Sequence, residues 1–408
     1  MSSDLPQATP GLRIGLAPWA RPSWRLVLDW VLGNARAGSL TMLLPSGERI
    51  DFHGTDAGPR AHMTLHRWSA LGRLLRGGHL GFAEGYMAGD FETANLTELL
   101  RWAMANEAAI SSLWNGSALA RALAWLAHLR RRNSRIGSRR NISAHYDLGN
   151  EFYLAWLDAG MNYSAALYAN PGQTLETAQI VKNDRVLSLL GAEPSSTVLE
   201  IGCGWGALAE RLIERTGCHV TGITLSHEQL AYAAARLDGA QPQPDIRLED
   251  YRDLATSFDR IVSIEMIEAV GERYWPAYFA TLKRCLNPGG IAVLQAITIA
   301  ETRYAAYRRY PDFIQKHIFP GGMLPTKTIL AEQMRRANLT LLHAEHFGGS
   351  YGRTIEAWRE RFVAAWPQLQ RLGFDDTFRR KWEYYFAYCQ TGFELGLLDV
   401  GLYQMQAA

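Results

Sequence analysis

The sequence has no run of about 18 uninterrupted apolar residues, which is the length that a helix needs to cross a bilayer. Cysteine is scarce, and none of the cysteines are spaced as Cys-x-x-Cys, which argues against a disulfide framework and a zinc site. The first ten residues lack the charged start and apolar run of a signal peptide. The four cysteines are Cys203, Cys218, Cys285 and Cys389. We therefore expect a protein of the reducing cytoplasm, without a bound metal, whose contact with any membrane is peripheral.

Charge of one sign is also lacking, because 42 basic and 40 acidic residues leave a net charge of only +2. This balance argues against a polycation that binds nucleic acid, and no recognised nucleic-acid module is present. The exception is Arg130–Arg140, which holds six arginines in eleven residues. This segment is either a solvated linker or a patch for anionic lipid headgroups, which attract each nearby arginine by about 1 kcal/mol.

The 408 residues, 48% of them hydrophobic, suit a globular chain of about two or three domains. Alternating residues over 39–53 predict a β-hairpin, and apolar residues at helical spacing follow over 64–78 and 96–129. This half therefore reads as a small α+β domain. The expected domains are an N-terminal domain over 1–129, a linker over 130–140 and a catalytic domain over 141–408.

After residue 190, apolar stretches rich in β-branched residues alternate with stretches of helical spacing. This alternation predicts an α/β domain in which helices cover both faces of a mostly parallel sheet. The expected strands are 197–201, 219–223, 258–263 and 290–296, with one intervening helix over 226–237. Further helices are expected over about 353–395.

The first of these strands runs into Gly202, Gly204 and Gly206, and Glu200 precedes the glycines. Glycines let the backbone turn sharply and approach a ligand, at the strand end where open α/β sheets bind ligands. The spacing differs from the Gly-x-Gly-x-x-Gly of dinucleotide-binding proteins, and an acidic residue suits a cationic ligand end. The loop therefore resembles the S-adenosylmethionine loop of class I methyltransferases. A tight turn without a ligand is the alternative.

Polar groups after the next strands complete the expected cofactor site. Hydroxyl groups and an amide can hydrogen-bond a ribose, and a carboxylate next to an aromatic ring suits adenine. These groups belong to Thr224, Leu225, Ser226, Gln229, Asp250 and Tyr251.

Several separated motifs together resemble the cyclopropane-fatty-acyl-phospholipid synthases and their relatives, the mycolic acid methyltransferases. The motifs are His145–Tyr153, Met161–Ser164, Thr224–Ser226 with Gln229, Asp250–Leu254, Phe319–Pro325 and Ala357-Trp358, with a weaker match over Gly81–Asp90. The resemblance implies methylation by S-adenosylmethionine of a cis double bond in a phospholipid acyl chain, giving a cyclopropane or a methyl-branched product. It also implies that Tyr163 and Ser164 close over the cofactor, and that the enzyme works on the inner face of the membrane.

The resemblance further implies a bicarbonate ion that serves as the base, held by a cysteine, a glutamate, a histidine, a backbone group near an isoleucine, and a tyrosine. This sequence keeps Glu268, Ile297 and Tyr351 at the matching positions. The cysteine position is Ala165 and the histidine position is Gln295. Bicarbonate is therefore a doubtful cofactor for this chain.

Glu265 stands where the family usually has glycine, three residues before Glu268. If the segment is helical, both carboxylates share one face and one pKa rises, which suits a proton acceptor. Our hypothesis is that Glu265 replaces bicarbonate as the general base, in a catalytic site shared with Glu268, Tyr351 and Gln295. The alternative is a surface or supporting role for Glu265. A base in a new place could also remove a different proton and leave a methyl-branched alkene.

Other interpretations stay open on the sequence alone. The chain could be a non-catalytic homologue that binds lipid or nucleoside, or a methyltransferase for a soluble small molecule. Arg303, Arg308 and Arg309 either hold a lipid phosphate or cover a helix face, whereas His343 and His346 lack companions at metal-binding spacing. The N-terminal domain would help to place the enzyme on a bilayer and could support a homodimer.

Overall fold

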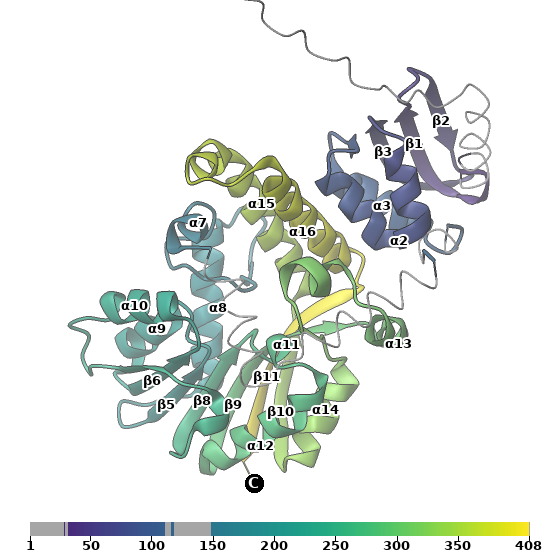
Figure 1. Cartoon of the computed structure of the whole chain (residues 1–408). Coiled ribbons are helices and arrows are strands. Elements are labelled where there is room, and N and C mark those ends of the chain that lie inside the picture. The colour runs from purple at the N-terminus through teal and green to yellow at the C-terminus, as the bar shows by residue number, and fades with distance from the viewer. Residues whose placement is uncertain (1–27, 29–31, 111–115, 118–147, 408) are drawn as a thin grey trace, which may run out of the picture.

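The computed structural model describes residues 28, 32–110, 116–117 and 148–407. These residues form a small N-terminal domain and a larger catalytic domain, which lie side by side (Figure 1). The arginine-rich segment 130–140 and the start of the His145–Tyr153 motif lie outside the described residues. No helix within the described residues is both long enough and apolar enough to cross a membrane.

Within the described residues, the N-terminal domain has a four-stranded sheet with the helices α2 and α3 against it. Its elements are β1 (Ala37–Leu43), β2 (Arg49–His53), β3 (Asp56–Leu65), α2 (Ser69–Met87), β4 (Phe91–Glu92) and α3 (Leu96–Ala105), and the strand order is β2-β1-β3-β4. The antiparallel pairing of Ser39 with His53 confirms the predicted hairpin. The helix predicted from residue 64 was wrong at its start, because Thr64 and Leu65 pair with β4. Asn95 caps α3 by accepting from the backbone N–H of Glu98 at 3.1 Å.

The catalytic domain is built on a seven-stranded sheet with the order β10-β11-β9-β8-β5-β6-β7. The strands are β5 (Thr197–Ile201), β6 (His219–Thr224), β7 (Asp245–Leu248), β8 (Phe258–Ile264), β9 (Leu286–Ile299), β10 (Leu339–His346) and β11 (Leu398–Ala407). The five strands from β9 to β7 run parallel, and β11 is antiparallel to both of its neighbours. The four predicted strands are confirmed, although β9 is longer than expected.

Helices cover both faces of this sheet, as the unbroken apolar strands predicted. On β5, Val198 packs with one hydrophobic core and its neighbour Leu199 with another, because successive side chains of a strand point to opposite faces. The covering helices are α8 (Leu175–Leu190), α9 (Ala207–Thr216) and α10 (His227–Arg236), together with α11 (Ile267–Val270), α12 (Trp275–Cys285) and α14 (Lys327–Arg336). The predicted helix over 226–237 is confirmed as α10, which Ser226 caps.

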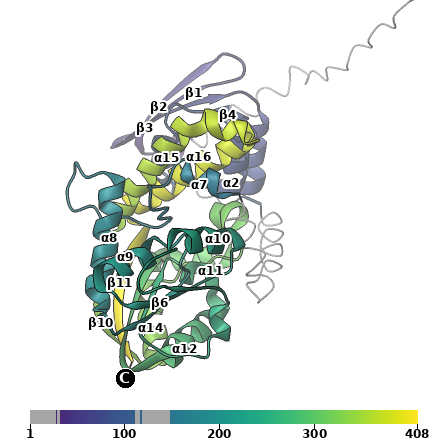
Figure 2. The same cartoon turned by 90° about the vertical axis from the view of Figure 1, so that its left-hand side faces the viewer.

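A helical layer lies between the sheet and the N-terminal domain (Figures 1 and 2). It contains α7 (Asn150–Leu154), α13 (Glu301–Arg309), the single π-helical turn η4 (Ile314–Ile318), α15 (Gly348–Arg371) and α16 (Asp376–Glu394). Its centre is a cluster of aromatic rings, in which the ring centroid of Trp156 lies 5.7 Å from that of Trp358, edge to face, and 5.6 Å from that of Trp382, at a tilt. These two tryptophans bring α15 and α16 together over the carboxyl ends of the strands.

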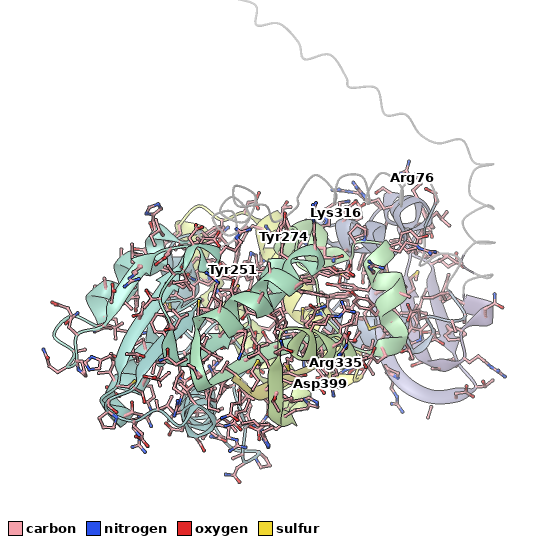
Figure 3. The ribbon with its side chains drawn as sticks, turned by 90° about the horizontal axis from the view of Figure 1, so that it is seen from below. Arg76, Tyr251, Tyr274, Lys316, Arg335 and Asp399 are labelled. Atoms are coloured by element: carbon pink, nitrogen blue, oxygen red, sulfur yellow. The ribbon has the colours of Figure 1, made fainter. Side chains whose placement is uncertain are left out.

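Ion pairs join the N-terminal domain to this layer. Glu84 of α2 accepts from Lys316 at 2.5 Å and from His317 at 3.2 Å, both in η4. Lys316 lies where the two domains meet in Figure 3. Glu107 receives two hydrogen bonds, at 2.7 and 3.0 Å, from Arg303 of α13. The domains therefore contact each other through charged groups as well as through α16.

Candidate active site

Two adjoining cavities open at the carboxyl ends of the parallel strands. The smaller, of about 170 Å³, lies over the glycine loop, and the larger, of about 290 Å³, lies between the sheet and the helical layer. Tyr163, Glu265 and Ala269 line both cavities. These three residues therefore mark the boundary at which a molecule bound in one cavity meets a molecule bound in the other.

The glycine loop forms the floor of the smaller cavity. Gly202 and Gly204 line it, with φ values of 82° and 53° that side-chain-bearing residues rarely adopt. Gly206 does not line the cavity, which corrects the prediction for this residue. It begins α9 with a φ of 85°, and an added Cβ would lie 3.2 Å from Ala233 of α10. The third glycine therefore serves the packing of two helices.

Glu200 lines the smaller cavity and is 3% exposed. Burial raises the pKa of its carboxyl to about 8. Its Oε2 atom has no hydrogen-bond partner among the described residues. A buried acceptor without a partner costs free energy unless a ligand satisfies it, so Glu200 fits the cationic end of S-adenosylmethionine.

Two other predicted contacts are on the wall of this cavity. Thr224 and Gln229 line it and hydrogen-bond each other at 2.8 Å, and Leu225 lies between them in the chain. Ser226 does not line the cavity, because its hydroxyl accepts from the backbone N–H of Gln229 as the cap of α10. Tyr163 and Ser164 also line it, as expected.

The structure pairs Asp250, the predicted adenine contact, with a neighbouring arginine. Asp250 is 3% exposed and does not line the cavity, because Arg252 binds both of its carboxylate oxygens, at 2.8 and 2.5 Å. Tyr251 does line the cavity, together with Glu249 and Arg252. The Arg252 guanidinium lies 5.6 and 5.9 Å from the rings of Tyr251 and Tyr274, which are labelled in Figure 3. The aromatic wall was thus predicted, and its arginine was missed.

Glu265 lies at the boundary of the two cavities, directly after β8. Its Oε1 accepts from the backbone N–H of Ala165 at 2.8 Å and from Nε2 of Gln295 at 2.7 Å. Its Oε2 accepts from the phenol of Tyr351 at 2.6 Å. Burial raises the pKa of this carboxyl, whereas these three donors favour its ionised form.

Glu268 lies beside Glu265, although not on a shared helix face as predicted. Glu265 has a left-handed φ of 49° and precedes α11, whereas Glu268 lies within it. Glu268 lines only the larger cavity and accepts from the backbone N–H of Ile297 at 2.5 Å. Burial, and then the charge of Glu265, raise the pKa of Glu268 to about 8. The two carboxyl groups thus interact, as expected, through a different local geometry.

The same geometry bears on bicarbonate. The groups at the positions of its expected ligands, Ala165, Gln295 and Tyr351, all direct their donors to the carboxylate of Glu265. A bicarbonate ion at this place would need these donors and would meet a like charge. The residues present therefore do not fit a bound bicarbonate.

The larger cavity is lined mainly by apolar and aromatic side chains, which suits a hydrocarbon chain. Its apolar lining includes Ile297, Ile299, Phe319, Met323, Ile355, Phe393 and Leu398. Its lining also includes His79, Met104 and Glu107 of the N-terminal domain. The sequence analysis missed these three residues, because no local pattern tells that a separate domain completes a cavity.

Three of the other polar residues singled out in the sequence have partners in the structure. Arg303 and Arg308 bind Glu107 and Glu272, so the helix-covering interpretation of these arginines suits the structure better than a free phosphate site. His343 lies on the edge strand β10, where it contacts Glu345 of the same strand and Arg185 of α8. No group of three metal-binding side chains occurs among the residues that the structure describes.

The sheet order, the glycine loop at the end of β5 and the unpartnered Glu200 define a class I S-adenosylmethionine-dependent methyltransferase. Residues 133–404 match the family model described as mycolic acid cyclopropane synthetase, and the chain belongs to this family. It is therefore an enzyme that methylates unsaturated acyl chains, forming a cyclopropane or a methyl branch.

Two curated relatives match along most of their length. The chain is 41% identical over 366 residues to the tuberculostearic acid methyltransferase UfaA1 of Mycobacterium tuberculosis, covering 84% of this chain and 83% of the relative. It is 35% identical to the cyclopropane-fatty-acyl-phospholipid synthase of Escherichia coli K12, covering 82% and 84%. Among solved structures, mycolic acid cyclopropane synthase CmaA1 complexed with SAH and CTAB matches with a TM-score of 0.62 and 30% identity, covering 66% of this chain and 98% of that one.

Proposed function

We propose that this enzyme methylates the cis double bond of a phospholipid acyl chain, with Glu265 as the general base in place of bicarbonate. The observation that carries the proposal is the set of three donors, from Ala165, Gln295 and Tyr351, that hold the carboxylate of Glu265 at the boundary of the two cavities. The rest of the machinery follows from what lines each cavity.

S-adenosylmethionine, when bound, supplies an electrophilic methyl group on a positively charged sulfur. Gly202 and Gly204 let the main chain approach this cofactor, and Glu200 offers a carboxylate to its cationic end. Thr224, Leu225, Gln229 and Tyr251 form further parts of the wall that contacts it. Tyr163 and Ser164 close the side of the cavity that faces the substrate.

The acyl chain lies in the larger cavity with its double bond next to Glu265. The alkene electron pair forms the new bond to the methyl carbon, while the sulfur keeps the electron pair of the broken bond. The positive charge then resides on the neighbouring acyl carbon, near the rings of Tyr163 and Tyr385, whose faces favour a cation. The apolar walls exclude water, which would otherwise capture the cation.

Glu265 then removes a proton, which a carboxylate with a raised pKa is suited to accept. If the proton leaves the added methyl group, the released electron pair closes a cyclopropane. If it leaves a neighbouring chain carbon, the pair forms a new double bond and a methyl-branched alkene results. Tyr351 and Gln295 orient the base, and Glu268 supports the site from the chain side.

The phospholipid substrate also suggests where the enzyme works. We propose that it attaches peripherally to a membrane surface, with the N-terminal domain over 1–129 and the arginine-rich segment 130–140 directed to the lipid, and that it could form a homodimer. A role of the N-terminal domain in lipid binding is supported by His79, Met104 and Glu107, because these residues line the larger cavity.

The test is turnover of vesicles of a dioleoyl phospholipid with methyl-labelled S-adenosylmethionine. We expect label in the acyl chains by mass spectrometry. Ozonolysis then separates the products, because an alkene is cleaved and a cyclopropane is not. The Glu265→Gln variant, which keeps the shape of the side chain, should bind the cofactor normally but lose about 10²–10⁴-fold in rate. Label in a soluble acceptor and none in lipid would contradict the substrate, and full activity of E265Q would contradict the base.

A further inference from the structure

Lys182 is a buried cation that no step of the reaction described above uses. It lies on α8, is 1% exposed and lines the smaller cavity. Its ammonium donates to the hydroxyl of Ser164 at 3.2 Å. Among the described residues, no carboxylate oxygen forms an ion pair with it. A lysine is almost never fully buried without such a partner, so its retention here calls for a reason.

The charged side chains near Lys182 are distributed unequally over the two cavities. Asp158, Glu200 and Glu265 act on its ammonium through space. Lys182 and Glu200 line only the cofactor cavity, Glu268 lines only the acyl cavity, and Glu265 lines both. Lys182 therefore stands on the side that the methyl group leaves, whereas Glu265 and Glu268 line the side where it arrives.

We propose that Lys182 repels the sulfonium charge of bound S-adenosylmethionine and so promotes transfer of that charge to the acyl chain. The ammonium raises the free energy of the cofactor before transfer, and this penalty falls as the sulfur becomes neutral. In the step itself the carbon–sulfur bond breaks toward sulfur, and the positive charge moves into the cavity that Glu265 and Glu268 line. Lys182 donates no proton and forms no bond in this step.

The state of Lys182 fits this role. Burial lowers the pKa of its ammonium to about 8, while the three carboxyl groups oppose the shift. It is therefore still mostly charged at neutral pH.

If Lys182 had only a structural role, it would be to hold the segment that contains Ser164. Gln179, one turn earlier on α8, already does so by donating to the backbone carbonyl of Ser164 at 2.8 Å. Asp158 holds the same segment by accepting from the backbone N–H of Asn162 at 2.9 Å. The hydrogen bond from Lys182 is therefore one of several that fix this segment, so a structural role does not by itself account for a buried charge at this place.

The test compares binding of cationic S-adenosylmethionine with that of neutral S-adenosylhomocysteine, by calorimetry on the full chain. In Lys182→Met the affinity for the cationic cofactor should rise relative to the neutral one by about tenfold. The single-turnover rate of methyl transfer to vesicles should fall by a similar factor. Lys182→Arg keeps the charge and should leave the affinity ratio within about twofold of the wild type.

A structural role alone would weaken both ligands in parallel, and such a result, or an unchanged ratio, would overturn the proposal. Lys182→Gln serves as a second neutral variant, which still can donate to Ser164, if Lys182→Met does not fold. The inference that the charge moves into the acyl cavity rests on the proposed function. The binding comparison needs no lipid. If lipid were not methylated, the proposed function would fail, but the effect of Lys182 on cofactor binding could still be measured.

Discussion

The phenol of Tyr351 donates a 2.6 Å hydrogen bond to the carboxylate of Glu265, although 86 positions separate the two residues. Tyr351 begins the buried face of α15, and Glu265 follows the strand β8. Burial raises the pKa of the tyrosine well above its ordinary value of 10.0, so it stays protonated and serves as a donor. The hydrogen bond favours the ionised form of Glu265, which is the form that can accept a proton.

Removing this donor should change the pH dependence of the enzyme. In Tyr351→Phe the pKa of Glu265 should rise further, because its ionised form loses a hydrogen bond. The rate rises with pH as Glu265 ionises, so the acidic limb of the kcat profile should move to higher pH. Tyr385→Phe is a matched control, because Tyr385 lines the same cavity but bonds Tyr163 at 3.0 Å. If kcat fell at the same acidic pH in Tyr351→Phe and in the wild type, this would contradict the role of Glu265 as the base.

The glycine loop can be tested with a matched pair of glycines. Gly204 and Gly191 have φ values of 53° and 57°, and an added Cβ would meet no atom within 4 Å at either position. Alanine should therefore cost each folded protein about 1–2 kcal/mol, from backbone strain alone. Only Gly204 lines the cofactor cavity, so G204A should also weaken S-adenosylmethionine binding by at least about tenfold, measured by calorimetry. Equal cofactor affinities in G204A and G191A would show that Gly204 does not approach the cofactor.

The contact between the domains should contribute pH-dependent stability. His317 and Lys316 lower the pKa of Glu84 from its ordinary value of 4.5 to about 2. The contribution is present above pH 4.5 and is lost as the pH falls toward 2, because the folded protein favours the ionised carboxyl. Glu84→Gln should therefore lower the free energy of unfolding by about 1 kcal/mol at pH 7, and by less at pH 3. A difference that denaturant titration finds equal at both pH values would point to a cause other than this charge.

Much of the catalytic sheet could be predicted from the sequence, because parallel strands are buried on both faces and stand out as short apolar runs. The limits of β5 were predicted to the residue, since Thr197–Ile201 is bounded by a turn and by the glycine loop. The strands β7, β10 and β11 were missed. Leu341 and Leu342 of β10 are both exposed at the sheet edge, and β11 inserts beside β9 only after two long helices.

Site residues that stand in a recognisable sequence motif could be predicted, whereas those whose role depends on packing could not. Glu265 stood out because a carboxylate replaces a residue type that the resembled family keeps, and the structure brings it to Gln295 and Tyr351. Asp250 looked like a ligand contact, but its neighbour Arg252 binds it. Lys182 was missed, although its place on the buried stripe of α8 was a signal, since lysine seldom lies on such a stripe.

The most direct test of the central claim exploits the backbone at Glu265. Its φ of 49° is one that glycine adopts without strain, so Glu265→Gly should fold while removing the carboxylate. Ala165, Gln295 and Tyr351 would then direct their donors into a space that a bicarbonate ion could enter. Labelled lipid product is measured in buffers freed of bicarbonate and in the same buffers with bicarbonate added.

If Glu265 is the base, the wild type turns over equally in both buffers. Glu265→Gly is then inactive without bicarbonate and regains activity when bicarbonate is added, whereas Glu265→Gln, which still fills the space, does not. A wild-type enzyme that loses its activity when bicarbonate is removed would contradict the claim that Glu265 is the base.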